Sequence, residues 1–242
     1  MLTREHDVAV VTISDPRRRN CLSAAVRDDF LAVFETLSAD PSCRAVVLTG
    51  ADGYFTAGAD VAEMAALSTE QAVGNLASLQ ALVLAVARLP VPVVAAVEGG
   101  AAGGGLSLAI ACDMVVVSSA ARLVLGFERL GLAPDLGGLY LFERRMGLAA
   151  ARRLAFLTSS IDPAEAVERG LMDELVEPGG ARARAVALAA EMATRSRTAN
   201  AVIKEMLADP PHSLAAAMET ELRLGARMYE SPEFVEGTRG RR

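Results

Sequence analysis

The stretch Pro92–Gly105 reads PVVAAVEGGAAGGG, in which a short apolar run ends at Glu98 and passes into glycine. A similar order occurs earlier, where Arg44–Gly50 (RAVVLTG) is followed by Phe55–Asp60 (FTAGAD). In both places the pattern predicts a buried strand that leads through glycine to the start of a helix. The first amides of a helix have no acceptors within it, and the helix dipole strengthens their attraction for a negatively charged oxygen. Two such loops side by side would direct two N–H groups at one oxygen, which is an oxyanion hole.

Strand and helix signals alternate over the first two-thirds of the chain. The strand candidates are compact β-branched runs of the kind that is buried on both faces of a parallel sheet. Longer helical stretches separate them, and this alternation indicates an α/β fold. The predicted strands are Val8–Ile13, Ala45–Thr49, Val93–Val97 and Met114–Val117, and the predicted helices lie around Ser23–Ser38, Gln71–Arg88 and Gly104–Cys112.

The last quarter of the chain is predicted to be helical. The sequence before it carries the start and stop signals of a short helix, with Asp162 as N-cap, Pro163 in the first turn and Gly170 just past the end. After Pro178–Gly180 no further strand signal follows, and we divide the chain into a core (1–190) and a helical region (191–242). A terminal segment of ~50 residues cannot bury its apolar face alone, so we expect it to pack on the core or on another subunit.

Composition excludes several classes of function. The chain has 242 residues, 24 Lys+Arg against 30 Asp+Glu, and only seven Phe, three Tyr and no Trp, which does not suit a nucleic-acid surface. Two distant histidines predict no metal cluster, and the odd count of cysteines (Cys21, Cys43, Cys112) predicts buried thiols in a reducing cytoplasm. The uncharged run Gln71–Ala87 is 17 residues long and holds polar side chains, so we expect no membrane span there. The first residues lack the apolar core of a signal peptide, which also predicts a cytoplasmic protein.

Several ordered motifs together resemble the enoyl-CoA hydratase/isomerase (crotonase) family, and the likeness runs from about Val8 to Gly237. The resemblance implies a crotonase-like spiral of ββα turns with a C-terminal helical trimerisation region, in a homotrimer or a dimer of trimers. It also implies an acyl-CoA thioester as partner, a place in fatty acid metabolism such as β-oxidation, and no cofactor beyond the coenzyme A of the substrate. The motifs are Phe55–Met64 (FTAGADVAEM), Ala95–Gly105 (AAVEGGAAGGG), Ala109–Asp113 (AIACD), Asn20–Ser23 (NCLS), Leu130–Gly138 (LGLAPDLGG), and Leu157-Thr158 followed by Ala164–Ala166 and Gly170-Leu171.

The same resemblance assigns roles to individual residues. The amides of Ala57 and Gly104 are expected to hold the thioester carbonyl. Arg17 stands where relatives often place a basic residue near the coenzyme A phosphates, and an arginine after Gly237 could replace a lysine of the relatives. The residues expected to border the substrate are Ala57, Gly58, Ala59, Asp60, Gly104, Phe127 and Arg17, and the arginines near the end are Arg239, Arg241 and Arg242.

The chain departs from the hydratase pattern at both catalytic glutamates. Ser107 and Phe127 stand at those two positions, and neither side chain can act as an unaided base. Glu128, next to Phe127, is expected to be a surface carboxylate, because neighbouring side chains of an extended segment point to opposite faces. Asp135 follows Pro134 in a loop of small and apolar residues, where lost hydration should raise its pKa, as a general base requires. Similar Pro-Asp loops occur in family members that isomerise.

One plausible carboxylate favours double-bond isomerisation, since moving a double bond needs a single base whereas hydration benefits from two groups. The first alternative is enoyl-CoA hydratase, with Ser107 or Glu128 positioning water. The second is a catalytically reduced acyl-CoA-binding or assembly protein. The third is a serine hydrolase, because Gly105–Ala109 approximates a nucleophile elbow and Asp135 and His212 follow in hydrolase order, although the predicted strand ends too early for an elbow.

Overall fold

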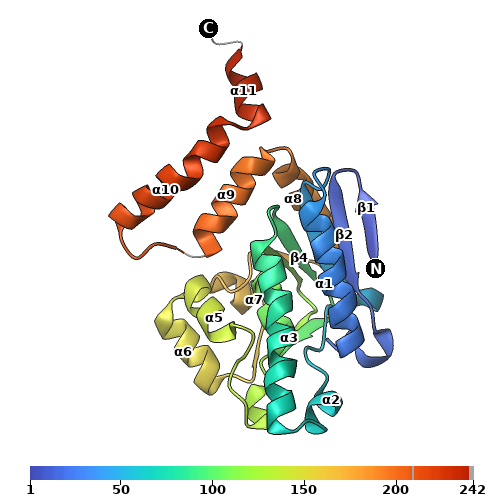
Figure 1. The fold of residues 1–242 in the computed structure, drawn as a ribbon. Helices are drawn as coiled ribbons and strands as arrows, with labels where there is room; N and C mark the ends of the chain where they lie inside the picture. Colours follow the sequence, from blue (N-terminus) through green and yellow to red (C-terminus); the bar gives the residue numbers. More distant parts are fainter. Residues whose placement is uncertain (209, 240–242) are drawn as a thin grey trace.

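The computed structural model describes residues 1–208 and 210–239, which form a large and a small β-sheet surrounded by helices (Figure 1). The large sheet has the order β1-β2-β3-β4-β6-β9, with β1 antiparallel to β2 and every other neighbouring pair parallel. The small sheet has the order β5-β7-β8. The strands are β1 (Leu2–Glu5), β2 (Val8–Ile13), β3 (Ala45–Gly50), β4 (Val93–Val97), β5 (Gly100–Ala102), β6 (Met114–Ser118), β7 (Arg122–Val124), β8 (Ser160–Ile161) and β9 (Glu174–Val176).

The helices confirm the alternation that the sequence predicts. Asp162 caps α7, as expected, by accepting hydrogen bonds from the amides of Ala164 and Glu165. The helices are α1 (Ala24–Ala39), α2 (Val61–Ala65), α3 (Thr69–Arg88), α4 (Gly104–Ile110), α5 (Gly138–Met146), α6 (Leu148–Leu157), α7 (Pro163–Glu168), α8 (Ala181–Ala193), α9 (Arg197–Ala208), α10 (Leu214–Tyr229) and α11 (Pro232–Arg239), with short 3-10 turns at Pro16–Arg18, Ala51–Gly53 and Phe127–Leu130.

The two sheets are linked by a repeated ββα unit. From β4 in the large sheet the chain enters β5 in the small sheet and then α4, and it repeats the step from β6 through β7 to α5. After β3 the chain makes the same move, since Thr56 pairs with Ala101 of β5 before α2 begins. Each repeat therefore passes from the large sheet through the small sheet to a helix, and this spiral confirms the predicted fold.

The large sheet is buried on both faces, which explains its β-branched sequence. Val46 and Leu48 of β3 face a core shared with α1, α3 and α4, whereas Ala45 and Val47 face a second core under α8. Glu98, at the end of β4, accepts hydrogen bonds from the amides of Gly179 and Ala181 and so caps the start of α8. Helix α8 spans the predicted boundary between residues 190 and 191, and that division remains a prediction.

All three cysteines are buried and unpaired, as the sequence predicts. Burial raises the pKa of the Cys112 thiol to about 12 and that of Cys21 to about 11. Since the thiolate is the reactive form, these side chains behave as packing residues.

Helix α3 differs from the expectation for its uncharged run. It is 20 residues long, and its most apolar window has a mean hydropathy of 1.2, so by length and composition alone it could cross a membrane. The sequence-based prediction counts only the uncharged residues between Glu70 and Arg88. The helix includes both of these charged residues and runs from Thr69 to Arg88. Its buried side chains lie in the main core, and one such helix is weak evidence for a membrane protein.

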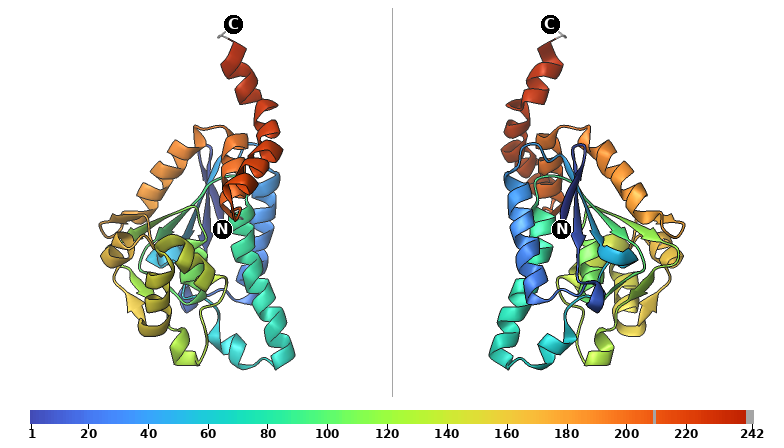
Figure 2. Two further views of the ribbon diagram at one scale, coloured as in Figure 1. Left: turned by 90° about the vertical axis from the view of Figure 1, so that its left-hand side faces the viewer. Right: turned by 90° about the vertical axis from the view of Figure 1, so that its right-hand side faces the viewer.

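Helix α9 is anchored on the core by a buried ion pair, whereas α10 and α11 extend away from the sheets (Figure 2). Lys204 of α9, the only lysine of the chain, donates to Asp113 (2.7 Å) and to the carbonyls of Val86 and Val91. Beyond it, α10 buries only Leu224 and α11 buries no side chain. The expected packing of this region on the core is therefore slight among the described residues, and packing on another subunit stays a prediction. Exposed apolar side chains lie at Leu214, Met218, Leu222, Tyr229, Phe234 and Val235.

Candidate active site

The loop after β3 is fixed by a buried asparagine. Asn20, in a left-handed conformation (φ 57°), donates its side-chain amide to the carbonyls of Ala51 (2.9 Å) and Tyr54 (2.6 Å). Its own carbonyl accepts a hydrogen bond from the Thr56 hydroxyl (2.6 Å), and that hydroxyl accepts one from the Gly58 amide. These bonds order the chain up to Gly58 and present the next residues to the start of α4. The sequence placed Asn20 in a family motif but gave no sign of this role.

The amide of Ala57 is already occupied. It donates to the carbonyl oxygen of Arg19 over 2.9 Å, so its single hydrogen is not available to a ligand in this conformation. The expected role of the Ala57 amide is therefore wrong for this structure. Two residues further on, the N–H of Ala59 has no acceptor among the described residues, and Ala59 lies beside the pocket. The sequence could not show which of the two amides donates a hydrogen bond to another part of the backbone and which stays available.

The start of α4 lies against this loop. Gly58 has a positive φ (82°), and a Cβ placed on it would be 2.4 Å from the Ala102 carbonyl and 3.3 Å from the Gly104 nitrogen. Only glycine permits this approach. Gly104 is the first residue of α4, and no acceptor for its N–H is found in the described part of the chain. Two amides, those of Ala59 and Gly104, are thus brought together at the pocket, as an oxyanion hole requires.

Asp135 supplies the acidic side chain of the pocket. Its Oδ1 atom is buried without a hydrogen-bond partner among the described residues and lies 3.5 Å from where a Cβ on Gly104 would be. Burial raises the pKa of the Asp135 carboxyl, with a backbone hydrogen bond acting in the opposite direction. The predicted loss of hydration at this carboxylate is confirmed, and its Oδ1 atom also lies near Gly104, the first residue of α4.

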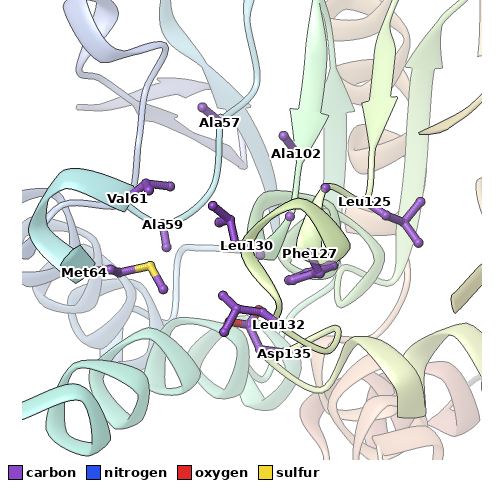
Figure 3. Close-up of a pocket in the computed structure, with 13 residues that line it drawn as sticks. Ala57, Ala59, Val61, Met64, Ala102, Leu125, Phe127, Leu130, Leu132 and Asp135 are labelled. Carbon is purple, nitrogen blue, oxygen red and sulfur yellow. The ribbon is translucent and has the colours of Figure 1, made fainter. Parts of the chain in front are cut away.

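The pocket is an apolar cavity of about 140 Å³ between α2, α4 and the Phe127–Leu130 turn (Figure 3). Asp135 is the only ionisable side chain among the described residues that line it. Figure 3 shows Phe127, Leu130 and Leu132 around Asp135, with Met64 and Ala59 across from them. The lining residues are Ala57, Ala59, Val61, Met64, Ala102, Gly103, Gly104, Leu125, Gly126, Phe127, Leu130, Leu132 and Asp135.

The structure separates the three residues that stand at or near the hydratase glutamate positions. Phe127 is 6% exposed and lines the pocket. The Glu128 side chain is 52% exposed, faces Arg129 at 3.7 Å and is not among the lining residues, so it is the surface carboxylate that the sequence favoured. Ser107 is fully buried and donates its hydroxyl to the Asp135 carbonyl (3.0 Å). Neither Ser107 nor Glu128 is therefore placed to hold a water molecule in the pocket, which contradicts the role given to them in the hydratase alternative.

The same contact removes the hydrolase alternative. The Ser107 hydroxyl donates to the Asp135 backbone, and His212 is exposed just before α10. A nucleophilic serine needs a base within hydrogen-bonding reach, and no described hydrogen bond joins these two side chains.

Asp60 and Arg17 lie outside the pocket lining. Asp60 is buried, accepts hydrogen bonds from the Ala62 and Glu63 amides, and pairs with Arg18. Because it accepts these amide hydrogen bonds, Asp60 is the N-cap of α2. Burial opposes its ionisation, but the hydrogen bonds prevail and lower the pKa of its carboxyl. Arg17 is exposed, and no ion pair or hydrogen bond of its side chain is found among the described residues. Its expected contact with phosphate remains a prediction.

Two further expectations concern metals and the end of the chain. In residues 1–208 and 210–239, no group of three His, Cys, Asp or Glu side chains is placed to hold a metal ion. Arg239 ends α11 and is exposed, while Arg241 and Arg242 lie outside the described residues.

Comparisons with known proteins identify the family and the fold. The chain matches the family model described as enoyl-CoA hydratase/isomerase over residues 3–240. It is 36% identical over 184 residues to the short-chain-enoyl-CoA hydratase of Clostridium acetobutylicum, which covers 74% of this chain and 69% of that protein. Its fold matches the crystal structure of an enoyl-CoA hydratase from Bacillus anthracis with a TM-score of 0.92 at 27% identity, covering 98% of this chain and 93% of that one. An enoyl-CoA hydratase structure from Polaromonas sp. JS666 gives the same TM-score at 29% identity, with coverages of 98% and 94%.

The spiral of ββα turns, with helix-terminal amides beside an apolar pocket, defines an acyl-CoA enzyme of the crotonase fold. The chain belongs to the enoyl-CoA hydratase/isomerase family.

Proposed function

We propose that the chain moves the double bond of an enoyl-CoA, converting a 3-enoyl thioester into the 2-enoyl thioester. The observation that carries this proposal is that Asp135 is the single carboxylate among the described residues that line the pocket, and the other lining side chains are apolar. Isomerisation needs one base that removes a proton from one carbon and returns it to another. Hydration gains from two groups, one to activate water and one to deliver a proton.

In the proposed mechanism, the amides of Ala59 and Gly104 donate to the thioester oxygen. Asp135 takes a proton from C2, and the electron pair of the C–H bond moves into a dienolate whose charge rests on that oxygen. The protonated Asp135 then returns the proton to C4, which leaves the double bond between C2 and C3. Preformed donors stabilise this charge without having to reorganise, and the apolar walls strengthen the interaction by excluding water. Atoms and charge balance without a further reactant, and coenzyme A enters only as part of the substrate.

Hydration of a 2-enoyl-CoA is the second candidate, and the names of the relatives favour it, since the proteins compared above are called hydratases. In this site, Asp135 would have to activate the water and supply the proton by itself. A catalytically reduced acyl-CoA-binding protein is the third candidate, and an active Asp135 would exclude it.

Incubation of the protein with matched 2-enoyl- and 3-enoyl-CoAs separates these candidates. We expect 3-enoyl-CoA to change its proton NMR spectrum to that of the 2-enoyl isomer with no change in mass. A gain of the mass of one water from the 2-enoyl substrate, with no isomer formed, would identify a hydratase instead. Tight binding with neither product, and no deuterium incorporation at C2 in heavy water, would identify a binding protein.

The wider expectations remain proposals. The exposed apolar face of α10 and α11 supports assembly with further copies of the chain, as a trimer or a dimer of trimers, because apolar surface of this extent is rarely left in water. The buried, unpaired cysteines support a reducing compartment such as the cytoplasm, where fatty acid metabolism would supply enoyl-CoA.

A further inference from the structure

The loop that carries Asp135 is a tight turn in a rarely used conformation. Leu136 (φ 53°) and Gly137 (φ 76°) both have positive φ, and the Gly138 amide donates to the Asp135 carbonyl over 2.8 Å. This is the pattern of a type I′ turn, in which both central residues prefer to be Gly, Asn or Asp. Leucine disfavours this region because its Cβ approaches the backbone carbonyl. Contacts outside the turn must therefore hold it in place.

Two contacts from α4 hold the turn. The Leu136 side chain is buried against Gly104, where a Cβ would lie 2.7 Å from the Leu136 Cδ1 atom. The Ser107 hydroxyl donates to the Asp135 carbonyl (3.0 Å), which thus accepts two hydrogen bonds. A Cβ on Gly138 would lie 2.7 Å from the same hydroxyl, so the turn closes directly over Ser107.

We infer that Ser107 is a positioning residue: its hydroxyl clamps the strained Asp135–Gly138 turn and so holds the Asp135 carboxylate beside Gly104, in the desolvated part of the pocket. The inference rests on the proposed role of Asp135 as the base. Ser107 does not touch the reacting atoms. One helix, α4, then positions both halves of the site, the oxyanion donor through Gly104 and the base through Ser107. A base held in reacting geometry avoids the cost of being ordered during the reaction.

The test is Ser107→Ala, with Ser118→Ala as the matched control, since Ser118 is an equally buried serine at the end of β6. We expect Ser107→Ala to lower kcat by about 10-fold to 100-fold with KM within about threefold of the parent. We also expect the acid limb of the pH profile of kcat/KM to move to lower pH, because a released turn lets water reach the carboxylate. Ser107→Thr, which keeps the hydroxyl, should retain the parent's acid limb, and Ser118→Ala should leave kcat and the acid limb unchanged.

A second variant covers the case in which Ser107→Ala does not fold. Ser107→Cys keeps a side chain of similar shape but replaces the hydroxyl with a weak S–H donor, so it should lower kcat and shift the acid limb in the same direction. The inference is overturned if the folded variants keep the parent's kcat and acid limb, even with a lower melting temperature. If Asp135→Asn is inactive in the same experiment, that result leaves the proposed function standing, whereas an active Asp135→Asn overturns the function itself.

Discussion

Replacement of Asp135 by asparagine is expected to lower the rate of 3-enoyl-CoA isomerisation by about 10³-fold, the size of a lost general base. Asparagine has the shape of aspartate but cannot carry a proton from C2 to C4. Asp135 is the only ionisable side chain in the described pocket lining, so no neighbour can take over this role. The matched control is Glu128→Gln, which neutralises a nearby but exposed carboxylate and should stay within about twofold of the parent rate. Near-normal turnover of Asp135→Asn would remove Asp135 from the mechanism.

The raised pKa of Asp135 gives the same variant a second signature. Because burial disfavours the charged carboxylate, activity should rise as pH increases through a value above 3.8, the ordinary pKa of aspartate. In the unfolded chain the group ionises at its ordinary pKa, so above the raised value the ionised form lowers the stability of the folded protein. Asp135→Asn should therefore melt at a higher temperature than the parent near pH 7. This difference should shrink as pH falls through the raised pKa toward the ordinary one, and scanning calorimetry across pH measures it.

Removal of the Gly104 amide is the second change with a large expected effect. Gly104→Pro deletes the N–H at the first position of α4, where proline is normally tolerated because that amide makes no bond within the helix. The preceding residue, Gly103, is outside the α region that a following proline disfavours. The loss of one oxyanion-hole donor should lower kcat by about 10²-fold to 10³-fold.

The control for this change is Gly104→Ala, which adds the same Cβ but keeps the N–H. Its Cβ would lie 2.7 Å from the tip of the Leu136 side chain, so this variant measures the steric part of the effect. Comparison of the two variants separates the effect of the Cβ from the change at the nitrogen, where proline replaces the N–H with its Cδ atom. Affinity for free coenzyme A, which has no thioester oxygen, should be the same in both. Equal kcat values for Gly104→Pro and Gly104→Ala would show that the Gly104 amide does not stabilise the transition state.

Sequence alone predicts the parts of this protein that depend on local pattern. The four inner strands of the large sheet (β2, β3, β4 and β6) are recognisable because both of their faces are buried, which requires continuous β-branched runs such as Val8–Ile13. The edge strands β1 and β9 are only partly buried, carry no such run and were not predicted. The start of a helix at Gly104 follows from the glycine run after a strand, and a desolvated Asp135 follows from a carboxylate among small and apolar residues. The choice of Gly104 as an oxyanion donor rests on the family resemblance.

The remaining features depend on contacts between distant segments. The sequence does not show that the Arg19 carbonyl takes the Ala57 amide, and so it points to the wrong member of the loop. It identifies Ser107 as a replaced glutamate, but the bond of its hydroxyl to the Asp135 carbonyl follows only from how the Asp135 turn closes on α4. The positive φ of Leu136 is equally hidden, since leucine gives no turn signal and tertiary packing overrides its preference.

A crystal structure with a bound, unreactive acyl-CoA thioester tests the central claim most directly. We predict that the thioester oxygen lies about 3 Å from the amide nitrogens of both Ala59 and Gly104, with C2 of the acyl chain facing the Asp135 carboxylate. A thioester oxygen out of hydrogen-bonding reach of both nitrogens, or a C2 turned away from Asp135, would contradict it.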